Sequence, residues 1–308
     1  MTRIGIIGAG AMGSGIGQVA AMAGHEVMIY DLSSQSITKA RDSILSSLNK
    51  LAAKSKLTDQ EAKSIFGRIY FIDQFESLID CNVIIEAIVE LEAEKKKLFA
   101  RIEDIVDEGT ILASNTSSIS ITSLASCLKD PSRLIGIHFF NPPVLMKLVE
   151  IIPALQTSKQ VIDETIALIS SWDKTTVIAK DTPGFIVNRI ARPYYGEALR
   201  IAEEQLASPE TIDQAMKEFG GFKMGPFELM DFIGNDINDA VTRSVWTAMY
   251  YESRYKPSLL QESMVKAGWL GRKTGRGFYN YNATCCTYDV GYWFDQRTKT
   301  NFCLPKYF

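Results

Sequence analysis

Histidine is scarce in this sequence, so its two histidines are the first side chains to consider for proton transfer near neutral pH. His138 lies near the end of an apolar run at 134–139 that predicts a buried strand. Doubly wound sheets bind ligands beyond the carboxyl ends of their strands, a position that suits a general base. His25 follows Gly24 at the start of another strand, where we expect an exposed or capping role. His138 is therefore the candidate base.

Glu150 is the natural partner for that histidine. It lies within the next predicted strand, at 147–152, with apolar residues on both sides. A buried carboxylate is costly without a partner. An imidazole N–H that donates to it would fix the tautomer of the ring and raise its basicity. From these residues alone, two satisfied core side chains remain an equally good interpretation.

Three glycines near the start of the chain indicate a dinucleotide site. A predicted strand at 3–7 runs into Gly-Ala-Gly-Ala-Met-Gly, and a helix-like run follows at 14–23. Gly8 permits a tight turn, Gly10 lets the backbone approach a pyrophosphate, and Gly13 lets the helix pack closely on the strand. The helix N-terminus would supply free N–H groups to the phosphates.

Asp31 ends the next strand, predicted at 26–30, about 20 residues after the glycines. Its carboxylate can accept hydrogen bonds from both hydroxyls of an adenosine ribose, and it would repel a 2′-phosphate. No arginine at 32–34 could neutralise such a phosphate. The order of these elements predicts NAD rather than NADP.

Two further polar groups could face the same edge of the sheet. Ser-Asn-Thr-Ser-Ser at 114–118 follows a predicted strand and could bind cofactor or substrate, although an N-cap cluster for the next helix explains it equally well. Asn188 lies on a helix just past a predicted domain boundary. By itself that asparagine indicates little.

The wider pattern predicts an α/β protein with an N-terminal Rossmann-like doubly wound sheet and a mostly helical C-terminal domain. A helical hairpin is expected at about 36–66, its second helix capped by Thr58 with Glu61 three residues on. Asp-Thr-Pro-Gly at 181–184 marks the change to helical composition. We expect a cofactor domain at 1–182, a helical domain at 183–282 and an atypical tail at 283–308. Further strands are expected at 83–89, 110–113 and 176–180, with a helix at 91–106.

The composition favours a small-molecule partner. Lys and Arg number 33 against 36 Asp and Glu, and this formal net charge of −3 offers no general attraction to nucleic acid or acidic lipid. We expect no secretory leader, no membrane span and no membrane partner. The five cysteines lack metal-ligand spacing, so we expect no metal and a cytoplasmic location.

With these motifs in place, the chain resembles the short-chain L-3-hydroxyacyl-CoA dehydrogenases, which include the 3-hydroxybutyryl-CoA dehydrogenases. The resemblance runs from residue 2 to about Tyr281. The specific matches are the glycines at 8–13, Ser-Asn-Thr-Ser-Ser at 114–118, His-Phe-Phe-Asn-Pro at 138–142, Met-Lys-Leu-Val-Glu at 146–150 and Pro-Gly-Phe-Ile-Val-Asn-Arg at 183–189.

The resemblance implies a role for each matching position. His138 would be the catalytic base and Glu150 its orienting acid, while Ser117 and Asn188 would bind near the reacting oxygen. Ser47 and Lys54, on the first helix of the hairpin, would contact CoA, where the charge pattern alone predicts only a solvated face. The helical domain would form a homodimer. The NAD site would be lined by Asp31, Glu90, Lys95, Asn115, Ser117 and Asn141.

The implied reaction converts an (S)-3-hydroxyacyl-CoA into a 3-oxoacyl-CoA, as in fatty acid β-oxidation: the 3-hydroxyl gives its proton to His138 as a hydride passes to NAD. Residues 225–246 are also similar to the 3-hydroxyadipyl-CoA dehydrogenases of phenylacetate catabolism. A related sugar-acid dehydrogenase and an NAD-binding structural protein without turnover, as some crystallins are, remain alternatives. The intact set of Ser117, His138, Glu150 and Asn188 argues against the last.

One departure from the family follows Gly-Arg-Gly-Phe-Tyr at 275–279. Family members end there or continue into a second copy of the helical domain. Residues 283–308 instead carry three of the five cysteines and many aromatics without helical or strand periodicity. We expect this tail to result from a truncation or frame change, and its removal to preserve activity.

Overall fold

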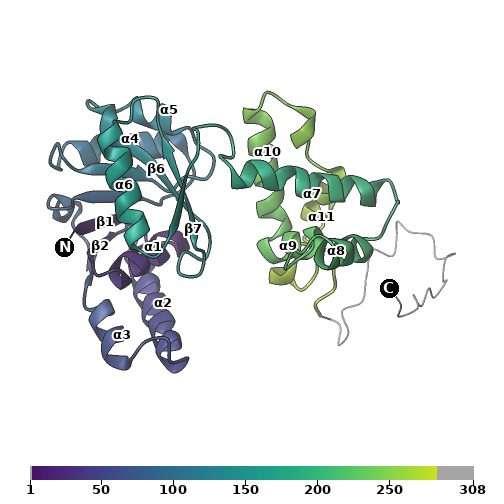
Figure 1. Cartoon of the computed structure of the whole chain (residues 1–308), viewed down its shortest axis with the longest axis horizontal. Coiled ribbons are helices and arrows are strands. Elements are labelled where there is room, and N and C mark those ends of the chain that lie inside the picture. Colours follow the sequence, from purple (N-terminus) through teal and green to yellow (C-terminus); the bar gives the residue numbers. More distant parts are fainter. Residues whose placement is uncertain (1, 283–308) are drawn as a thin grey trace. The chain divides into compact units, whose positions relative to one another are not determined.

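The computed structural model describes residues 2–282, and the chain divides between Ile186 and Val187 into two compact units (Figure 1). The sequence-based boundary at residue 183 remains a prediction, and the predicted tail at 283–308 lies outside the described residues. Within the described part of the chain, no helix is long and apolar enough to cross a membrane.

The first unit is built on one eight-stranded sheet with helices, which agrees with the predicted doubly wound type; the sequence predicts seven of the eight strands. The strand order is β3-β2-β1-β4-β5-β6-β7-β8. All neighbours pair in parallel except β6 and β7, which are antiparallel. The strands are β1 (Arg3–Ile7), β2 (Glu26–Tyr30), β3 (Ile69–Ile72), β4 (Val83–Glu86), β5 (Ile111–Ser114), β6 (Leu134–Phe139), β7 (Leu148–Pro153) and β8 (Thr175–Ile178).

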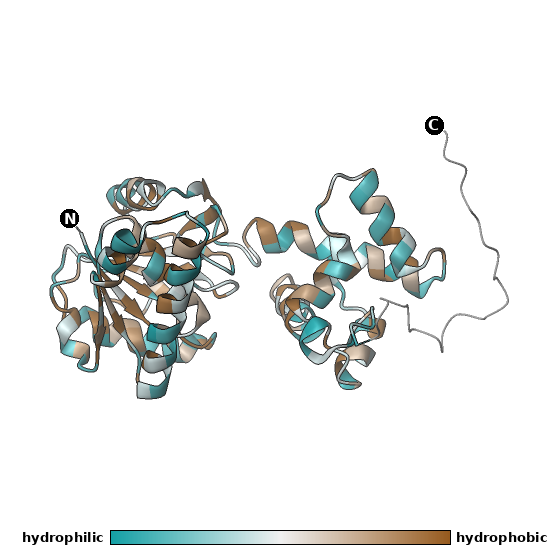
Figure 2. Cartoon of the chain, turned by 90° about the horizontal axis from the view of Figure 1, so that it is seen from below, coloured by the Kyte–Doolittle hydropathy of each residue, from teal (hydrophilic) through white to brown (hydrophobic). Residues whose placement is uncertain are grey.

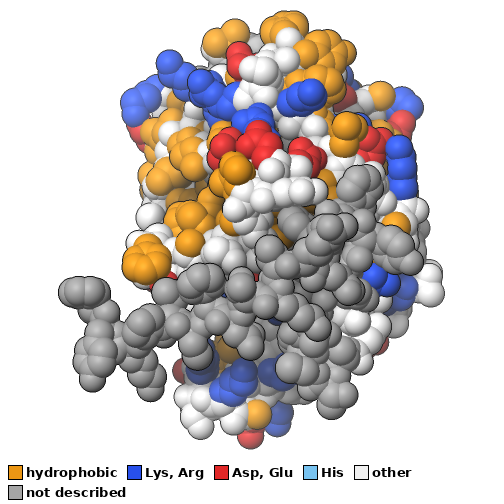
Figure 3. Space-filling model, turned by 90° about the vertical axis from the view of Figure 1, so that its right-hand side faces the viewer, with side chains coloured by type: hydrophobic (Ala, Val, Ile, Leu, Met, Phe, Trp, Pro, Cys, Tyr) orange, Lys and Arg blue, Asp and Glu red, His pale blue; other side chains and the backbone are white. Residues whose placement is uncertain are grey.

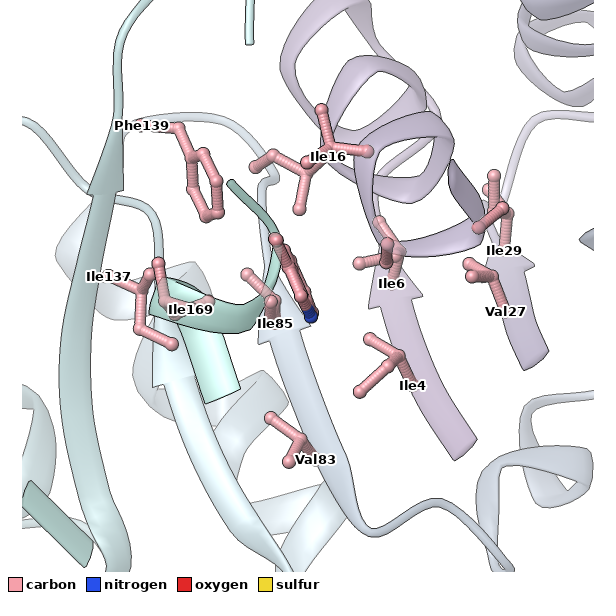
Figure 4. Close-up of a cluster of buried hydrophobic side chains, with 14 of the residues drawn as sticks. Ile4, Ile6, Ile16, Val27, Ile29, Val83, Ile85, Ile137, Phe139 and Ile169 are labelled. Carbon is pink, nitrogen blue, oxygen red and sulfur yellow. The ribbon is translucent and has the colours of Figure 1, made fainter. Parts of the chain in front are cut away.

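Helices cover both faces of this sheet. One buried cluster joins Ile16, Ile44 and Ile169 to strand residues such as Ile6 and Ile85, and Figure 4 shows several of these side chains converging. A second cluster holds Phe99, Ile102 and Leu124 on the other face. The helices are α1 (Ala11–Met22), α2 (Ser34–Ala53), α3 (Asp59–Phe66), α4 (Glu92–Glu103), α5 (Ile121–Ala125) and α6 (Lys159–Ser171), with 3-10 turns at Phe75–Leu78 and Pro131–Arg133.

The helical hairpin α2–α3 is present, and its second helix begins as predicted. The Thr58 hydroxyl accepts the backbone N–H of Glu61 at 3.2 Å, and the Glu61 carboxylate accepts the Thr58 backbone N–H at 2.7 Å. This reciprocal capping box satisfies two N–H groups that the helix leaves unbonded. It fixes where the turn of the hairpin ends.

Two strands differ from the sequence-based prediction. Strand β3 was not predicted; it is a four-residue edge strand directly after α3, and its Tyr70 is exposed. Strand β4 ends at Glu86, although the apolar run continues to Val89. The reason is local: the Glu86 carboxylate accepts the Ile88 backbone N–H at 2.7 Å, so the chain turns out of the sheet.

The second unit is helical, as its composition predicts, and Figure 2 shows apolar and polar stripes alternating along its helices. Its core includes Leu199, Phe227, Met230 and Phe278. The helices are α7 (Val187–Glu203), α8 (Pro209–Glu218), α9 (Pro226–Ile233), α10 (Asn235–Ala248) and α11 (Leu259–Lys266), with 3-10 turns at Ser253–Tyr255 and Arg272–Thr274.

A buried carboxylate fixes the last described segment of this unit. Asp231 on α9 accepts the backbone N–H groups of Phe278 and Tyr279, each at 3.0 Å. Burial raises the pKa of this carboxyl, while these hydrogen bonds act in the opposite direction. A side chain at Gly277 would lie 2.0 Å from the Asp231 oxygen, so glycine is required there. The Gly-Arg-Gly-Phe-Tyr motif is therefore a packing motif.

Candidate active site

Most candidate residues of the first unit gather at one edge of its sheet. Strands β1, β4, β5 and β6 are consecutive parallel neighbours, so their carboxyl ends lie along the same edge (Figure 1). The loops that leave these strands carry the glycines, Glu90, Ser117 and Asn141. His138 is the second-to-last residue of β6. This edge is where doubly wound folds bind ligands.

The glycine loop has the shape that a dinucleotide requires. Gly8 has a φ of +105°, and a Cβ there would lie 2.5 Å from the Ala87 carbonyl oxygen. A Cβ at Gly13 would lie 1.8 Å from the Gly8 carbonyl oxygen. Around Gly10, by contrast, a Cβ would meet nothing within 4 Å, and α1 begins after it without a side-chain cap. The loop thus offers free N–H groups and an open approach to a phosphate.

Asp31 is held beside that loop by the protein itself. Its Oδ2 accepts the Ala9 backbone N–H at 2.7 Å, and its Oδ1 accepts the Ser33 backbone N–H at 2.8 Å. Each carboxylate oxygen has a further lone pair to offer. The carboxylate is therefore already oriented to accept hydrogen bonds from a ribose, and the residues fit a dinucleotide cofactor.

His138 and Glu150 form the expected pair. They lie directly opposite each other on the antiparallel strands β6 and β7, and His138 Nδ1 is 2.7 Å from Glu150 Oε2. The Glu150 side chain is fully buried and the histidine ring is 7% exposed. An ionised carboxylate can only accept, so a neutral imidazole in this contact donates from Nδ1 and keeps the lone pair of Nε2. That arrangement leaves Nε2 as the basic atom.

Two aromatic rings lie close to the imidazole. The ring centroid of His138 lies 4.6 Å from that of Phe140 and 5.7 Å from that of Phe185. Glu150 also accepts, through Oε1, the backbone N–H of Ile186 at 2.9 Å. The pair is thus fixed by strand register, ring packing and a second hydrogen bond to the carboxylate.

The loop after β6 is anchored on its neighbours. Asn115 Oδ1 accepts the backbone N–H of Phe139 at 2.9 Å, which ties the end of β5 to the residue after His138. Lys174 donates to the carbonyl oxygens of Pro143 and Met146 at 2.6 and 2.8 Å. Burial lowers the pKa of this lysine. These bonds hold the 140–147 loop, which carries the exposed Asn141.

Ser117 is bound to Glu90. The Glu90 Oε1 atom accepts the Ser117 backbone N–H at 2.9 Å, its hydroxyl at 3.3 Å and the Thr116 hydroxyl at 2.6 Å. Burial pushes the pKa of Glu90 upward, but the Lys95 charge and these hydrogen bonds outweigh it, so the pKa is lowered from its usual value. Glu90 is therefore ionised at neutral pH.

Lys95 is buried although its side chain carries a charge. Its side chain is 1% exposed, and its Nζ donates to Glu86 at 2.5 Å and lies 3.3 Å from Glu90. Glu86 was not among the predicted site residues. The argument that singled out Glu150, a carboxylate within an apolar strand, applies equally to Glu86 and would have found it.

Two further candidates lie on the helical hairpin. Ser47 and Lys54 are two helical turns apart on one side of α2, at its C-terminal end. An open cavity of about 410 Å³ lies at the adjoining turn and includes Lys56 in its lining. Asn188 is the second residue of α7 and belongs to the second unit, whereas every other candidate lies in the first.

Comparison with known families gives two matches that together span most of the chain. The model of the 3-hydroxyacyl-CoA dehydrogenase NAD-binding domain matches residues 3–182. The model of the 3-hydroxyacyl-CoA dehydrogenase C-terminal domain matches residues 184–281.

Individual relatives agree with these matches. The chain is 45% identical to a 3-hydroxyadipyl-CoA dehydrogenase of Escherichia coli, over 91% of this chain and 59% of that protein. It is 43% identical to a probable 3-hydroxybutyryl-CoA dehydrogenase of Deinococcus radiodurans, over 91% of this chain and all of that one. The crystal structure of (S)-3-hydroxybutyryl-CoA dehydrogenase from Ralstonia eutropha superposes with a TM-score of 0.88 at 42% identity, covering 92% of this chain and 100% of that one.

Proposed function

The chain belongs to the 3-hydroxyacyl-CoA dehydrogenase family, and we propose that it reversibly oxidises an (S)-3-hydroxyacyl-CoA to the 3-oxoacyl-CoA with NAD as cofactor. The observation that carries the proposal is the 2.7 Å contact between His138 and Glu150, on the same sheet edge as the glycine loop. A histidine oriented in this way can remove a proton from a hydroxyl group as a general base.

The chemistry divides between cofactor and protein. Bound NAD supplies the hydride acceptor. His138 accepts the proton of the substrate 3-hydroxyl at Nε2, and Glu150 stabilises the imidazolium that forms. Ser117 and Asn188 bind the reacting oxygen and thereby orient the substrate. In the reverse direction the imidazolium returns the proton to the same oxygen.

Residues of the sheet edge would hold NAD. Gly8, Gly10 and Gly13 admit the pyrophosphate, and Asp31 accepts the ribose hydroxyls and disfavours a 2′-phosphate. The other predicted cofactor residues are Glu90, Lys95, Asn115, Ser117 and Asn141.

The CoA moiety would lie along α2. Ser47 and Lys54 present a hydroxyl and an ammonium on one side of that helix, and Lys56 lines the adjoining cavity. An anionic nucleotide tail is attracted to such a surface.

The test follows NADH consumption with acetoacetyl-CoA and longer 3-oxoacyl-CoAs, with NADPH as the cofactor control. We expect rapid oxidation of NADH and little of NADPH. Absence of CoA-thioester-dependent NADH oxidation by folded protein would overturn the proposal. A free sugar acid, tested with NAD in the oxidative direction, separates the related sugar-acid activity.

A second candidate substrate is 3-hydroxyadipyl-CoA, because the E. coli relative at 45% identity bears that name. This chain spans only 59% of the length of that relative. Parallel assays with 3-oxoadipyl-CoA and 3-oxohexanoyl-CoA, which differ in the terminal carboxylate, distinguish the two. A higher kcat/KM for 3-oxoadipyl-CoA would support the second candidate, and with it a role in phenylacetate catabolism rather than in β-oxidation.

The second unit is proposed to form a homodimer. Its exposed side chains include Phe219, which is 89% exposed, and Tyr250, which is 93% exposed. Figure 3, viewed from the side of this unit, shows hydrophobic side chains gathered on the surface beside charged ones. Exposed apolar area of this kind is usual at protein interfaces. Light scattering would check for twice the chain mass. The cytoplasmic location and the lack of a nucleic-acid or membrane partner remain predictions.

A further inference from the structure

Glu86 is a fully buried carboxylate with no part in the proposed reaction. It is the last residue of β4, and three groups from different parts of the first unit donate to it. Oε1 accepts the Lys95 ammonium at 2.5 Å and the Ile88 backbone N–H at 2.7 Å. Oε2 accepts the Ser114 hydroxyl at 2.7 Å. Glu86 thus joins α4, the loop after β4 and the end of β5.

Stability alone does not account for this buried pair. Lys95 is 1% exposed and Glu86 is not exposed at all, so both charges have lost their hydration. Buried ion pairs of this kind contribute about as much as apolar residues of the same volume, or less. What the pair supplies is a fixed geometry, because breaking either end leaves an uncompensated charge.

The same ammonium extends the network to the cofactor edge. Lys95 Nζ also lies 3.3 Å from Glu90 Oε2. The other oxygen of Glu90 holds the backbone N–H and hydroxyl of Ser117. A continuous series of contacts therefore runs from Glu86 through Lys95 and Glu90 to Ser117.

We propose that Glu86 is a positioning residue: through Lys95 it sets the position of Glu90, and through Glu90 that of the Ser117 hydroxyl. The inference rests on the proposed function for the roles of Glu90 and Ser117 toward NAD and substrate. In physical terms, the Lys95 ammonium interacts with two carboxylates at once, those of Glu86 and Glu90. With Glu86 neutral, Lys95 moves toward Glu90, and the Glu90 carboxylate turns away from Ser117.

The test uses Glu86→Gln, which keeps the size of the side chain and removes its charge. ADP serves as a probe of the glycine loop and Asp31 alone, and NADH as a probe that also reaches the Glu90 region. We expect ADP to bind within about twofold of the wild type, NADH about tenfold more weakly, and kcat/KM to fall about 10- to 100-fold, as misplaced groups cause elsewhere. NADH affinity and kcat/KM within twofold of the wild type would overturn the proposal.

Glu103→Gln is the matched control. Glu103 is a carboxylate of the first unit with a side chain that is 6% exposed. It pairs with Arg133 at 3.3 Å, and it accepts the backbone N–H groups of Lys129 and Asp130. None of these contacts leads to Glu90. We expect this variant to lose stability while its NADH affinity and turnover stay at wild-type values. An equal loss of NADH affinity in both variants would show that Glu86 acts only through stability, which contradicts the proposal.

A double variant, Glu86→Gln with Lys95→Met, covers the case in which the single change prevents folding. It removes both charges of the Glu86–Lys95 pair, so neither is left buried without the other. Glu90 loses its ammonium partner, but its side chain is 38% exposed and keeps its hydrogen bonds from Thr116 and Ser117. We expect it to fold and to bind NADH as weakly as Lys95→Met alone, because the two residues act in series. Wild-type NADH affinity in the double variant would overturn the proposal. The binding measurements need no acyl-CoA, so failure of the proposed substrate is distinguishable from failure of this inference.

Discussion

Glu150 accepts the backbone N–H of Ile186 at 2.9 Å, so the carboxylate that faces His138 also binds the last residue of the first unit. Helix α7 begins at the next residue, and Asn188 follows it. One buried side chain thus holds both the imidazole and the last residue of the first unit. Changes at Glu150 are expected to affect more than basicity.

Replacement of the base gives the first prediction. His138→Gln removes the group that accepts the hydroxyl proton and leaves the glycine loop and Asp31 in place. We expect kcat to fall by about two to four powers of ten, the usual contribution of general base catalysis. NADH affinity, measured by fluorescence titration, should stay within about twofold. Near-normal turnover would remove His138 from the mechanism.

The second prediction concerns the orienting acid. Glu150→Gln offers one acceptor oxygen where the carboxylate offers two, so either His138 or Ile186 loses its partner. Without the negative charge the imidazolium is also less stable. We expect kcat to fall about 10- to 1000-fold. The double variant with His138→Gln should be no slower than His138→Gln alone, because groups that act as a unit are not additive. Multiplicative losses in steady-state assays would indicate independent roles.

The third prediction concerns cofactor choice. Asp31→Asn removes the charge that repels a 2′-phosphate, and its amide group cannot accept both the Ala9 and Ser33 N–H groups. We expect kcat/KM for NADH to fall about tenfold, which corresponds to a loss of about 1.4 kcal/mol of binding free energy. The value for NADPH should rise, and the ratio of the two is the quantity to measure. An unchanged ratio would show that Asp31 does not select the cofactor.

The fourth prediction tests the CoA surface. Lys54 is exposed after the end of α2, so Lys54→Ala should not disturb the fold. We expect the KM for acetoacetyl-CoA to rise about fivefold, as for loss of one exposed charge contact of about 1 kcal/mol, with kcat unchanged. The KM for acetoacetyl-pantetheine, which lacks the nucleotide, should not change. Lys39→Ala, about four turns away on the same helix, is the control; an equal effect there would contradict a specific contact.

The fifth prediction is a pH dependence of stability. Burial acts to raise the pKa of Glu103, but the N–H groups of Asp130 and Lys129 and the Arg133 guanidinium outweigh it, so the pKa is lowered from 4.5. The unfolded chain therefore binds this proton more readily, and the stabilisation is present above pH 4.5 and lost as the pH falls through the folded pKa.

Glu103→Gln tests that sign directly. In urea unfolding at pH 7 the variant should be less stable by about 1 to 3 kcal/mol, the usual cost at a charged hydrogen bond. The difference from the wild type should shrink below pH 4.5, where protonation neutralises the wild-type side chain as well. A difference that stays constant from pH 7 to pH 3.5 would contradict the assignment.

Much of the fold could be predicted because most strands are buried on both faces and therefore read as apolar runs. Strand β3 escaped prediction because it has four residues, lies at the sheet edge and exposes Tyr70, so it carries neither a long run nor a clear alternation. The reversal of β7 has no hydropathy signal. Its only trace in the sequence is the short connection at 140–147, which has no room for a crossover helix.

The candidate site divides in the same way. The glycines and the His138–Glu150 pair could be proposed from residue type and neighbours alone. Glu86 could have been proposed in the same way, but its partner could not, because Lys95 begins a run of three lysines that is typical of a solvated helix face. Only the packing of α4 on the sheet turns that one lysine inward, where two carboxylates receive it.

The antiparallel pairing of β6 and β7 has a consequence for how this sequence can change. His138 and Glu150 are 12 residues apart and face each other only because the intervening loop sets their register. Insertion or deletion of one residue at 140–147 would slide β7 by one position and turn Glu150 to the opposite face of the sheet. A change in the length of this loop would therefore separate the imidazole from its carboxylate in one step.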